Sequence, residues 1–395
     1  MVPYYEDAWA YGGIPRLASA MARGLARRGH DVTVCTTDVA DERSRVSASP
    51  SGPDEAGVRV RVFRNVSNHL AYHWQFFTPM GLARFLRRTA HAFDIGHLHA
   101  CRNMPGAIAV STLRRANVPY LVSPNGTAPR IERRRLAKLA FDMTLGRHVL
   151  PSAARVLAVT LAERAQLKAV GVDDARVHVV PNPIDEGEFV NPPDGQAFRA
   201  AHALGGAPVV LFLGKLSPRK SVDVLIRAFA MLARPDAQLV IAGNDSGSAS
   251  SALRLVANLG IGNRFVRVGL LRGRDRLDAL AAAEVVVYPC RDEVFGLVPV
   301  EALMCGTPVV VSGDSGCGEI IGRIGGGHVV PHGDASTLAS AIDAILSSPE
   351  IWRTRTAIAA ARARRAFGAD VVCAQLEAVY RDVLSESAME GRRPA

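Results

Sequence analysis

Several common signatures are missing from this 395-residue chain. No run of about 18 apolar residues occurs, which argues against a membrane-spanning helix. The six cysteines form no Cys-x-x-Cys pair and lie far apart in sequence, so they show neither a zinc pattern nor a small disulfide scaffold. Aromatic residues make up only 6% of the chain and no nucleic-acid-binding module is recognisable, so we expect no nucleic acid partner.

Signatures of several enzyme classes are absent as well. The chain contains no Asp-x-Asp, His-Glu-x-x-His, Gly-x-Ser-x-Gly or Gly-x4-Gly-Lys-Ser/Thr sequence. A metal-bridged diphosphate, a serine hydrolase and a P-loop enzyme therefore lose support. The first residues show no basic segment followed by an apolar one, so no secretory leader is indicated and we expect a cytoplasmic location.

The composition is that of a globular protein with an excess of cations. Hydrophobic residues make up 48% and charged residues 21%, which excludes a disordered chain. Lys and Arg number 47 and Asp and Glu 37, giving a net charge of +10. Such an excess attracts anions such as nucleotide phosphates or an acidic membrane face.

Short β-branched runs alternate with amphipathic helical segments, and the pattern occurs twice. Runs of consecutive valines indicate strands buried on both faces of a parallel sheet. We therefore predict an α/β protein with two doubly wound, Rossmann-like domains. Strands are expected at 32–37, 58–62, 95–99, 120–123, 156–159 and 177–180, then at 209–213, 238–241, 265–268, 285–288 and 309–311.

The predicted domains are residues 1–187 and 188–368, joined by a segment rich in Pro, Asp and Gly at 181–196. Residues 369–395 are expected to form a helix that packs back on the first domain, within a helical stretch at 349–385. The pattern predicts a first sheet that lacks its opening strand, because the chain opens in loop-like residues at 3–13. We expect a start site placed too late; a sheet that is simply smaller is the alternative.

The strongest motif is EVFGLVPVEALMCGTPVV, which follows a buried strand and opens a helix. Phe295, Gly296 and Leu297 are thereby placed at a helix N-terminus, where backbone N–H groups and the dipole bind anions. Glu293 precedes the helix and Glu301 lies one to two turns inside it. Both carboxylates are able to accept hydrogen bonds from sugar hydroxyls. Otherwise, Glu301 is an exposed carboxylate favoured by the dipole.

A second motif, FLGKLSPRKSVDVLIRAFA, carries cations from a strand end into a helix. Ligands of doubly wound domains bind at this edge of the sheet. Lys215 and Lys220 are therefore expected to neutralise a diphosphate leaving group, with a solvated basic loop as the alternative.

The first half offers weaker candidates. Gly12 and Gly13 precede a helix and allow a phosphate or sugar to approach the backbone. His97 and His99 alternate along a predicted strand and so share one side; His99 is nearer the ligand edge, although a lone histidine is usually structural. Asn125 lies in a polar loop after the next strand.

Two predicted helices are strongly basic. One begins in PRIERRR, where Arg130 lies, and is expected over 132–150; the other carries Arg84–Arg88 beside Phe85 and Leu86. A solvated face is the ordinary interpretation. The sharper hypothesis is docking on an anionic membrane leaflet.

Together these residues resemble the retaining glycosyltransferases of the GT-B fold, in the group 1 or family 4 class, over nearly the whole chain. The matching segments are YGG at 11–13, ARRGHDVTV at 26–34, HLH at 97–99, VVPNPID at 179–185, GKLSPRK at 214–220 and the Glu-x7-Glu string at 293–301.

The resemblance implies a nucleotide-sugar donor, UDP- or GDP-linked, as a co-substrate, and no metal or other cofactor. It implies that Lys215 and Lys220 bind the diphosphate and that Glu301 contacts the ribose. Glu293 would hold the sugar hydroxyls or the positive charge developing at the anomeric carbon, and His99 would touch the donor sugar. Gly13 and Gly12 would approach the diphosphate.

The helix N-terminus at 295–297 would cap the phosphates and the sugar. The family's usual acceptors are glycans and lipid-linked glycans of surface polysaccharide or glycolipid synthesis, and Asn125 and Arg130 are candidates for the acceptor side.

The sequence departs from the family pattern in several places. Asn125 stands where His is common, Ser221 replaces a common Gly, and Lys215 occupies a position that is more often Arg. Arg272 stands where a carboxylate would read guanine, which favours uridine slightly. A catalytically inactive nucleotide-sugar-binding protein, and an epimerase or phosphorylase of the same fold, are the alternatives.

Overall fold

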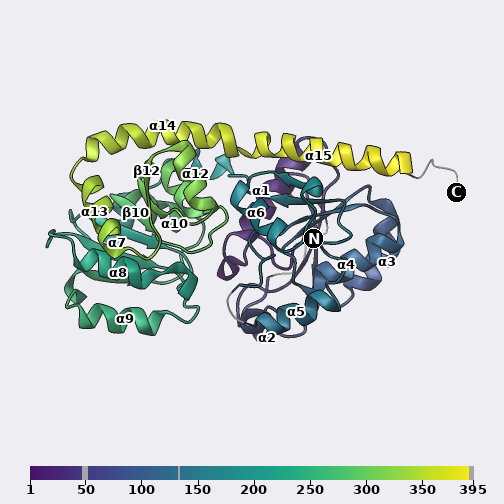
Figure 1. The fold of residues 1–395 in the computed structure, drawn as a ribbon, viewed down its shortest axis with the longest axis horizontal. Coiled ribbons are helices and arrows are strands. Elements are labelled where there is room, and N and C mark those ends of the chain that lie inside the picture. Colours follow the sequence, from purple (N-terminus) through teal and green to yellow (C-terminus); the bar gives the residue numbers. More distant parts are fainter. Residues whose placement is uncertain (47–51, 132–133, 391–395) are drawn as a thin grey trace. The chain divides into compact units, whose positions relative to one another are not determined.

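A computed structural model describes residues 1–46, 52–131 and 134–390. The chain divides into two compact units (Figure 1): Met1–Pro183 with Ala369–Ala395, and Ile184–Gly368. The division falls slightly before the sequence-based boundary at 187. Ile184 belongs to the second unit because its N–H donates to the Phe367 carbonyl at 2.7 Å and it bridges Gly368.

Parallel strands form the centre of the first unit. One sheet has the order β3 (Gly96–His99), β4 (Tyr120–Ser123), β5 (Arg155–Ala158) and β6 (Val177–Val179). A separate pair consists of β1 (Thr33–Thr37) and β2 (Arg59–Phe63).

Met1 and Val2 connect these two sheets. The Val2 N–H donates to the Cys35 carbonyl on β1 at 3.1 Å, and the His99 N–H on β3 donates to the Met1 carbonyl at 3.0 Å. The α-amino group donates to the His97 carbonyl at 2.6 Å. Two residues therefore occupy the position in which the sequence pattern lacks a strand.

The helices of the first unit largely follow the helical pattern of the sequence, which predicts helices at about 16–28, 81–92, 105–115, 132–150 and 161–170. The bounds are α1 (Ile14–Arg27), α2 (Asn68–Trp74), α3 (Leu82–Thr89), α4 (Met104–Arg115), α5 (Arg135–Met143), α6 (Leu161–Ala169) and α15 (Ala369–Glu390). The prediction of one helix over 132–150 was wrong in its extent: α5 ends at Met143, and 132–133 lie outside the described residues. The short α2 was not predicted, because NHLAYHW lacks a clear apolar period.

The second unit contains one six-stranded parallel sheet. Its order is β12 (Gly327–Val330), β11 (Val309–Ser312), β10 (Val285–Tyr288), β7 (Val209–Leu213), β8 (Gln238–Ala242) and β9 (Phe265–Val268). All of β10 is buried, as its run of valines indicates. The edge strand β12 was not predicted, because three glycines precede or open it.

The helices of the second unit are α7 (Gly195–Ala201), α8 (Val222–Ala230), α9 (Ala249–Asn258), α10 (Gly273–Ala282), α11 (Leu297–Met304), α12 (Gly316–Ile324), α13 (Ala335–Leu346) and α14 (Pro349–Phe367). Neither α7, inside the predicted linker, nor the glycine-rich α12 was expected. None of the described helices is both long and apolar enough to cross a membrane.

The helical stretch at 349–385 is two helices rather than one. It is broken at Gly368, whose φ of −54° and ψ of 140° are not helical. The first of the two, α14, buries Trp352 and Phe367 in the second unit. The other, α15, packs on α1 in the first unit, where the Sγ of Cys373 is only 2.5 Å from the position of a Cβ on Gly24. The C-terminal helix α15 is thus part of the first unit.

Candidate functional site

Two loops of the second unit converge because the strands before them are neighbours. Strands β7 and β10 pair in parallel, so the loops after them leave the same edge of the sheet. The Arg291 N–H donates to the Arg219 carbonyl at 2.8 Å and ties the two loops together. This edge is where doubly wound folds bind ligands. It brings the Lys215–Lys220 loop next to the Glu293 loop.

A buried ion pair joins these loops. The Nζ of Lys220 lies 2.5 Å from Oε2 of Glu293 and 2.5 Å from the hydroxyl of Tyr288, with the two charged side chains 11% and 15% exposed. Burial alone would raise the pKa of Glu293, but the charges of Lys220 and Arg219 and the hydrogen bonds outweigh it and lower the pKa. Both partners are therefore ionised at neutral pH.

Lys215 lies at the start of the same loop. Burial, and then the charges of Lys220 and Arg219, lower the pKa of Lys215 to about 8. The loop has little freedom: the Gly214 N–H donates to the Ala242 carbonyl at 2.9 Å, and a Cβ on Gly243 would meet the Gly214 carbonyl at 1.9 Å. A cationic cluster that bears an excess of charge at neutral pH fits a bound dianion.

The start of α11 is held by close packing. Gly296 is the N-cap, with φ of 78°, and a Cβ there would lie 2.5 Å from the Sγ of Cys317. The Phe295 side chain is buried and makes a T-shaped contact with Phe367 at 5.2 Å between ring centroids. The side chain of Phe295 is thus part of the hydrophobic core. Leu297, half-buried, is the first helical residue.

Glu301 is buried rather than exposed, so the alternative of an exposed first-turn carboxylate was wrong. Its Oε1 lies 3.4 Å from the guanidinium of Arg276 on α10, which also forms an ion pair with Glu188. Arg276 itself is 2% exposed. Sequence reasoning missed this arginine; a cation on the apolar face of a predicted helix was the available signal.

The glycine pair of the first unit lies at the N-terminus of α1. Gly12 has φ of 97°, a conformation that side chains avoid, and its N–H donates to the Trp9 carbonyl at 3.1 Å. Gly13 is the N-cap of α1. Because both residues are glycines, neither has a side chain that would cover this helix end.

His97 and His99 stack on each other with ring centroids 4.6 Å apart. His97 bonds the hydroxyls of Tyr380 and Ser123, each at 2.7 Å, which gives it a structural role. His99 is buried at the end of β3, and burial followed by the charges of its neighbours holds its pKa well below the ordinary value. No hydrogen bond to Nδ1 of His99 is found among the described residues. A neutral imidazole of this kind is suited to hydrogen bonding, not to acid catalysis.

Asn125 follows β4 in the left-handed region, with φ of 52° and its amide donating to the Ser123 carbonyl at 3.1 Å. Next to it, the Gly126 N–H donates to Glu163 at 2.6 Å. Burial is the main cause that raises the pKa of Glu163 to about 7, although two backbone N–H groups oppose it. Glu163 was not a candidate from the sequence.

Arg130 is exposed and lies 3.3 Å from Asp142, which also bonds Arg102 at 2.8 and 2.9 Å. These residues line a cavity of about 210 Å³ in the first unit, together with Arg147 and Arg176. Four guanidinium groups and one carboxylate make it an electropositive pocket.

Two family models match the chain. The glycosyl transferase 4-like domain covers residues 12–183, and the model described as glycosyl transferases group 1 covers residues 194–364. Among curated relatives, the D-inositol 3-phosphate glycosyltransferase of Kineococcus radiotolerans is 32% identical, with 96% of this chain and 92% of that protein covered. The protein of the same name from Xylanimonas cellulosilytica is 30% identical, with 97% and 93% covered.

Solved structures share the fold. Anabaena Alr3699/HepE in complex with UDP and glucose superposes with a TM-score of 0.75 at 19% identity, covering 96% of this chain and 98% of that one. Sucrose-phosphate synthase from Thermosynechococcus elongatus gives a TM-score of 0.74 at 24% identity, with 95% and 94% covered. These neighbours have the GT-B fold, as predicted for this chain.

Proposed function

Because this chain belongs to the group 1 glycosyltransferases, we propose that it moves a sugar from a nucleoside-diphosphate sugar to an acceptor hydroxyl with retention of configuration. The observation that carries this proposal is the paired cluster of Lys220 and Glu293 beside Lys215, at the ligand edge of the second sheet. A cation and an anion held side by side match a donor that has a negative diphosphate and an electron-poor anomeric carbon.

Each charged group of this cluster has a separate role in the proposed reaction. The bond from the anomeric carbon to the diphosphate breaks, and Lys215, Lys220 and the N–H groups at the start of α11 stabilise the charge that gathers on the leaving phosphate. Glu293 accepts hydrogen bonds from the sugar hydroxyls or faces the oxocarbenium-like carbon. The acceptor oxygen bonds to the same face, and its proton passes to the leaving phosphate oxygen.

Other predicted residues complete the donor site in this proposal. Glu301, oriented by Arg276, accepts a hydrogen bond from a ribose hydroxyl. Gly12 and Gly13 allow the diphosphate to approach the N-terminus of α1, and neutral His99 bonds the donor sugar. The two lysines supply the charge that a metal would otherwise supply, so we propose transfer without a bound metal.

Uridine is the base we propose. HepE has been solved with UDP and with UDP-glucose, and Arg272 offers no carboxylate to a guanine edge. The experiment is a screen of UDP- and GDP-sugars for thermal stabilisation and for release of free nucleoside diphosphate in the presence of acceptor extracts. Tight donor binding without turnover would favour an inactive binding protein instead, and phosphate-dependent glycan cleavage would favour a phosphorylase.

For the acceptor we propose a glycan or lipid-linked glycan reached from an anionic membrane surface. The support comes from α5, which buries none of its residues and exposes Leu136 at 82% and Met143 at 70%, beside the cation of Arg135. The other basic helix does not fit this hypothesis, since Leu86 of α3 is buried and Phe85 packs on Phe63.

Vesicle sedimentation tests the membrane proposal. Binding to phosphatidylglycerol vesicles, weakened by salt and by Leu136→Asp or Arg135→Glu, is expected. Leu253→Asp is the matched control, because Leu253 is also exposed on a helix, α9, of the second unit. Salt-independent binding, or equal loss in the control, would count against it. Arg133, part of the predicted basic stretch, lies outside the described residues.

A phosphorylated cyclitol is a second candidate acceptor. The curated relatives are named D-inositol 3-phosphate glycosyltransferases. The cavity around Arg102 and Arg130 is electropositive and so suits a phosphate group. Competition between inositol phosphates and glycan extracts for the transferred sugar distinguishes the two acceptors. Transfer to the cyclitol should then fall in Arg130→Ala.

A further inference from the structure

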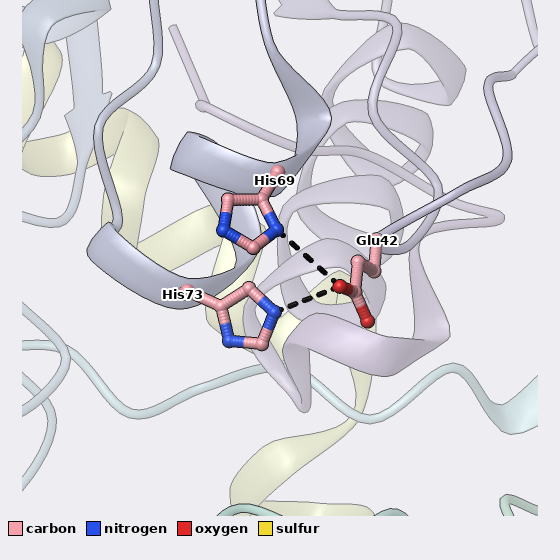
Figure 2. A group of neighbouring side chains, drawn as sticks. All are labelled: Glu42, His69 and His73. Atoms are coloured by element: carbon pink, nitrogen blue, oxygen red, sulfur yellow. Dashed lines mark hydrogen bonds and ion pairs between the residues drawn. The ribbon is translucent and has the colours of Figure 1, made fainter.

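Three side chains of the first unit converge outside the predicted donor site. Figure 2 shows His69 and His73, one helical turn apart on α2, both turned toward the carboxylate of Glu42. Oε1 of Glu42 lies 3.4 Å from Nδ1 of His69 and 2.9 Å from Nε2 of His73. The three nearest ligand atoms all lie within 4.8 Å of one another.

These separations fit a single small cation. Bonds of about 2.0–2.1 Å to a tetrahedral ion put neighbouring ligand atoms about 3.3 Å apart, close to the distances of 3.4 and 2.9 Å from Glu42 to the two imidazoles. The spacing of four residues along α2 places both imidazoles on one helix face. The third donor comes from a different segment, so the three atoms surround a point instead of lying in a row.

The backbone that carries the donors is ordered by its own hydrogen bonds. The carboxylate of Asp41 accepts from the N–H groups of Arg43 and Ser44 at 2.8 and 2.7 Å, which fixes the turn around Glu42. The Ser44 carbonyl accepts from the Asn68 side chain on α2 at 2.8 Å. The turn and the helix are therefore already joined beside the cluster.

We propose that Glu42, His69 and His73 bind a divalent transition-metal cation, with Zn²⁺, Ni²⁺ and Co²⁺ as the class. Two imidazoles and one carboxylate suit these ions, whereas Mg²⁺ and Ca²⁺ require oxygen ligands. The exposure of the three side chains leaves a fourth position to water. The charge of the neighbouring Arg43 opposes the cation, so a site of moderate affinity is expected.

Metal binding would strengthen the contact between the turn at Glu42 and α2, and α2 in turn packs next to the glycine pair. Tyr72, between the two histidines, contacts Tyr11 edge-on at 5.9 Å between centroids, and Tyr11 precedes Gly12. The cation would clip the turn at Glu42 to α2 and so hold this aromatic cluster in place. The proposal uses none of the donor-site residues and stands whether or not the proposed transfer reaction is found.

The test uses tag-free protein and the metal ions alone. Calorimetric titration with ZnCl₂, NiCl₂ and CoCl₂ at pH 7.5 should show one site per chain, with no binding of MgCl₂ or CaCl₂. His69→Ala, His73→Ala and Glu42→Gln should each weaken binding by at least about 10-fold, the lower end of what loss of an outer-shell partner costs. His91→Ala is the matched control, since His91 is an exposed histidine outside the cluster.

A second measurement needs no variant. Zn²⁺ should protect His69 and His73, but not His91, from diethylpyrocarbonate, as mapped by mass spectrometry. Unchanged affinity in the histidine variants, equal loss in the control, or lack of protection would overturn the assignment. If a variant fails to fold, the protection pattern of the wild type decides.

Discussion

The ion pair between Lys220 and Glu293 allows a quantitative prediction. Both side chains are at most 15% exposed and their charged atoms are 2.5 Å apart, so removal of one partner leaves a buried charge without compensation. Such a loss costs about 3–5 kcal/mol in buried pairs, and the partial exposure places Glu293→Gln near the lower end, at about 3 kcal/mol. Lys220→Met should cost a similar amount.

The double variant tests whether the loss of stability comes from the uncompensated buried charge. Lys220→Met with Glu293→Gln removes both charges, so its cost should fall well below the sum of the two single variants, with a coupling energy of about 2–3 kcal/mol. Tyr288→Phe, which removes only a neutral hydroxyl, should cost about 1 kcal/mol. Urea unfolding followed by a probe in the second unit gives these free energies.

The same variants separate stability from function. Glu293→Gln removes a negative charge from beside the proposed diphosphate site, so affinity for UDP should be kept or increased while sugar transfer falls. Lys220→Met should lose UDP affinity. Additive costs in the double variant, or single costs below 1 kcal/mol, would refute the buried-pair reasoning. A parallel loss of UDP affinity in Glu293→Gln would refute the proposed roles.

Three further predictions concern charge and backbone. The lowered pKa of Lys215, about 8, means that its charge is lost as pH rises through 8, so UDP affinity should weaken from pH 7 to 9.5; Lys215→Arg should abolish this dependence in calorimetric titrations. Gly296→Ala should destabilise more than Gly306→Ala, because both have positive φ but only the first meets a neighbour, Cys317, as thermal unfolding will report. Hydrogen bonds from Arg28 are the main cause that lowers the pKa of Glu377 to about 2, so the stabilisation by Glu377 is fully present above its ordinary pKa of 4.5 and is lost as pH falls through 2. The difference in melting temperature between wild type and Glu377→Gln should therefore shrink as pH falls from about 5 and vanish near pH 2.

The strand pattern was predictable because buried parallel strands have a strong local signature. Runs such as Val285–Tyr288 are apolar on both faces, and the glycines and charged residues after them mark the ligand edge. Segments without such periodicity were missed, including α2 with its histidines and α12 with its glycines. Their helical state depends on caps and neighbours, such as the Ser67 side chain that accepts from the Leu70 N–H at 3.3 Å.

The partners of the candidate residues were not predictable from local sequence. Glu293 and Lys220 are 73 residues apart and meet only because their strands are neighbours in the sheet. The same holds for Arg276, whose pairing with Glu301 requires α10 to pack on α11. Motifs identify the chemical groups, whereas sheet order decides which of them neutralise each other.

The residues that depart from the family pattern at Asn125 and Ser221 share a backbone conformation. Both have positive φ, 52° and 47°, and both follow the carboxyl end of a parallel strand or the loop it feeds. Ala100, after β3, and Asp292, after β10, are in the same conformation. Asparagine and aspartate tolerate this conformation well, whereas alanine and serine are held there at a cost of about 1–3 kcal/mol each.

Strain of this kind persists only where the surrounding contacts determine the backbone. Three of these residues border candidate ligand groups: Ala100 follows His99, Ser221 follows Lys220, and Asp292 precedes Glu293. At Ala100 the left-handed conformation turns the chain directly after His99, the last residue of β3. A glycine at Ser221 would relieve the local backbone strain, but it would lose the hydrogen bond between the Ser221 hydroxyl and His332 at 3.0 Å. The gain in backbone freedom and the loss of this hydrogen bond therefore oppose each other in the stability of the protein.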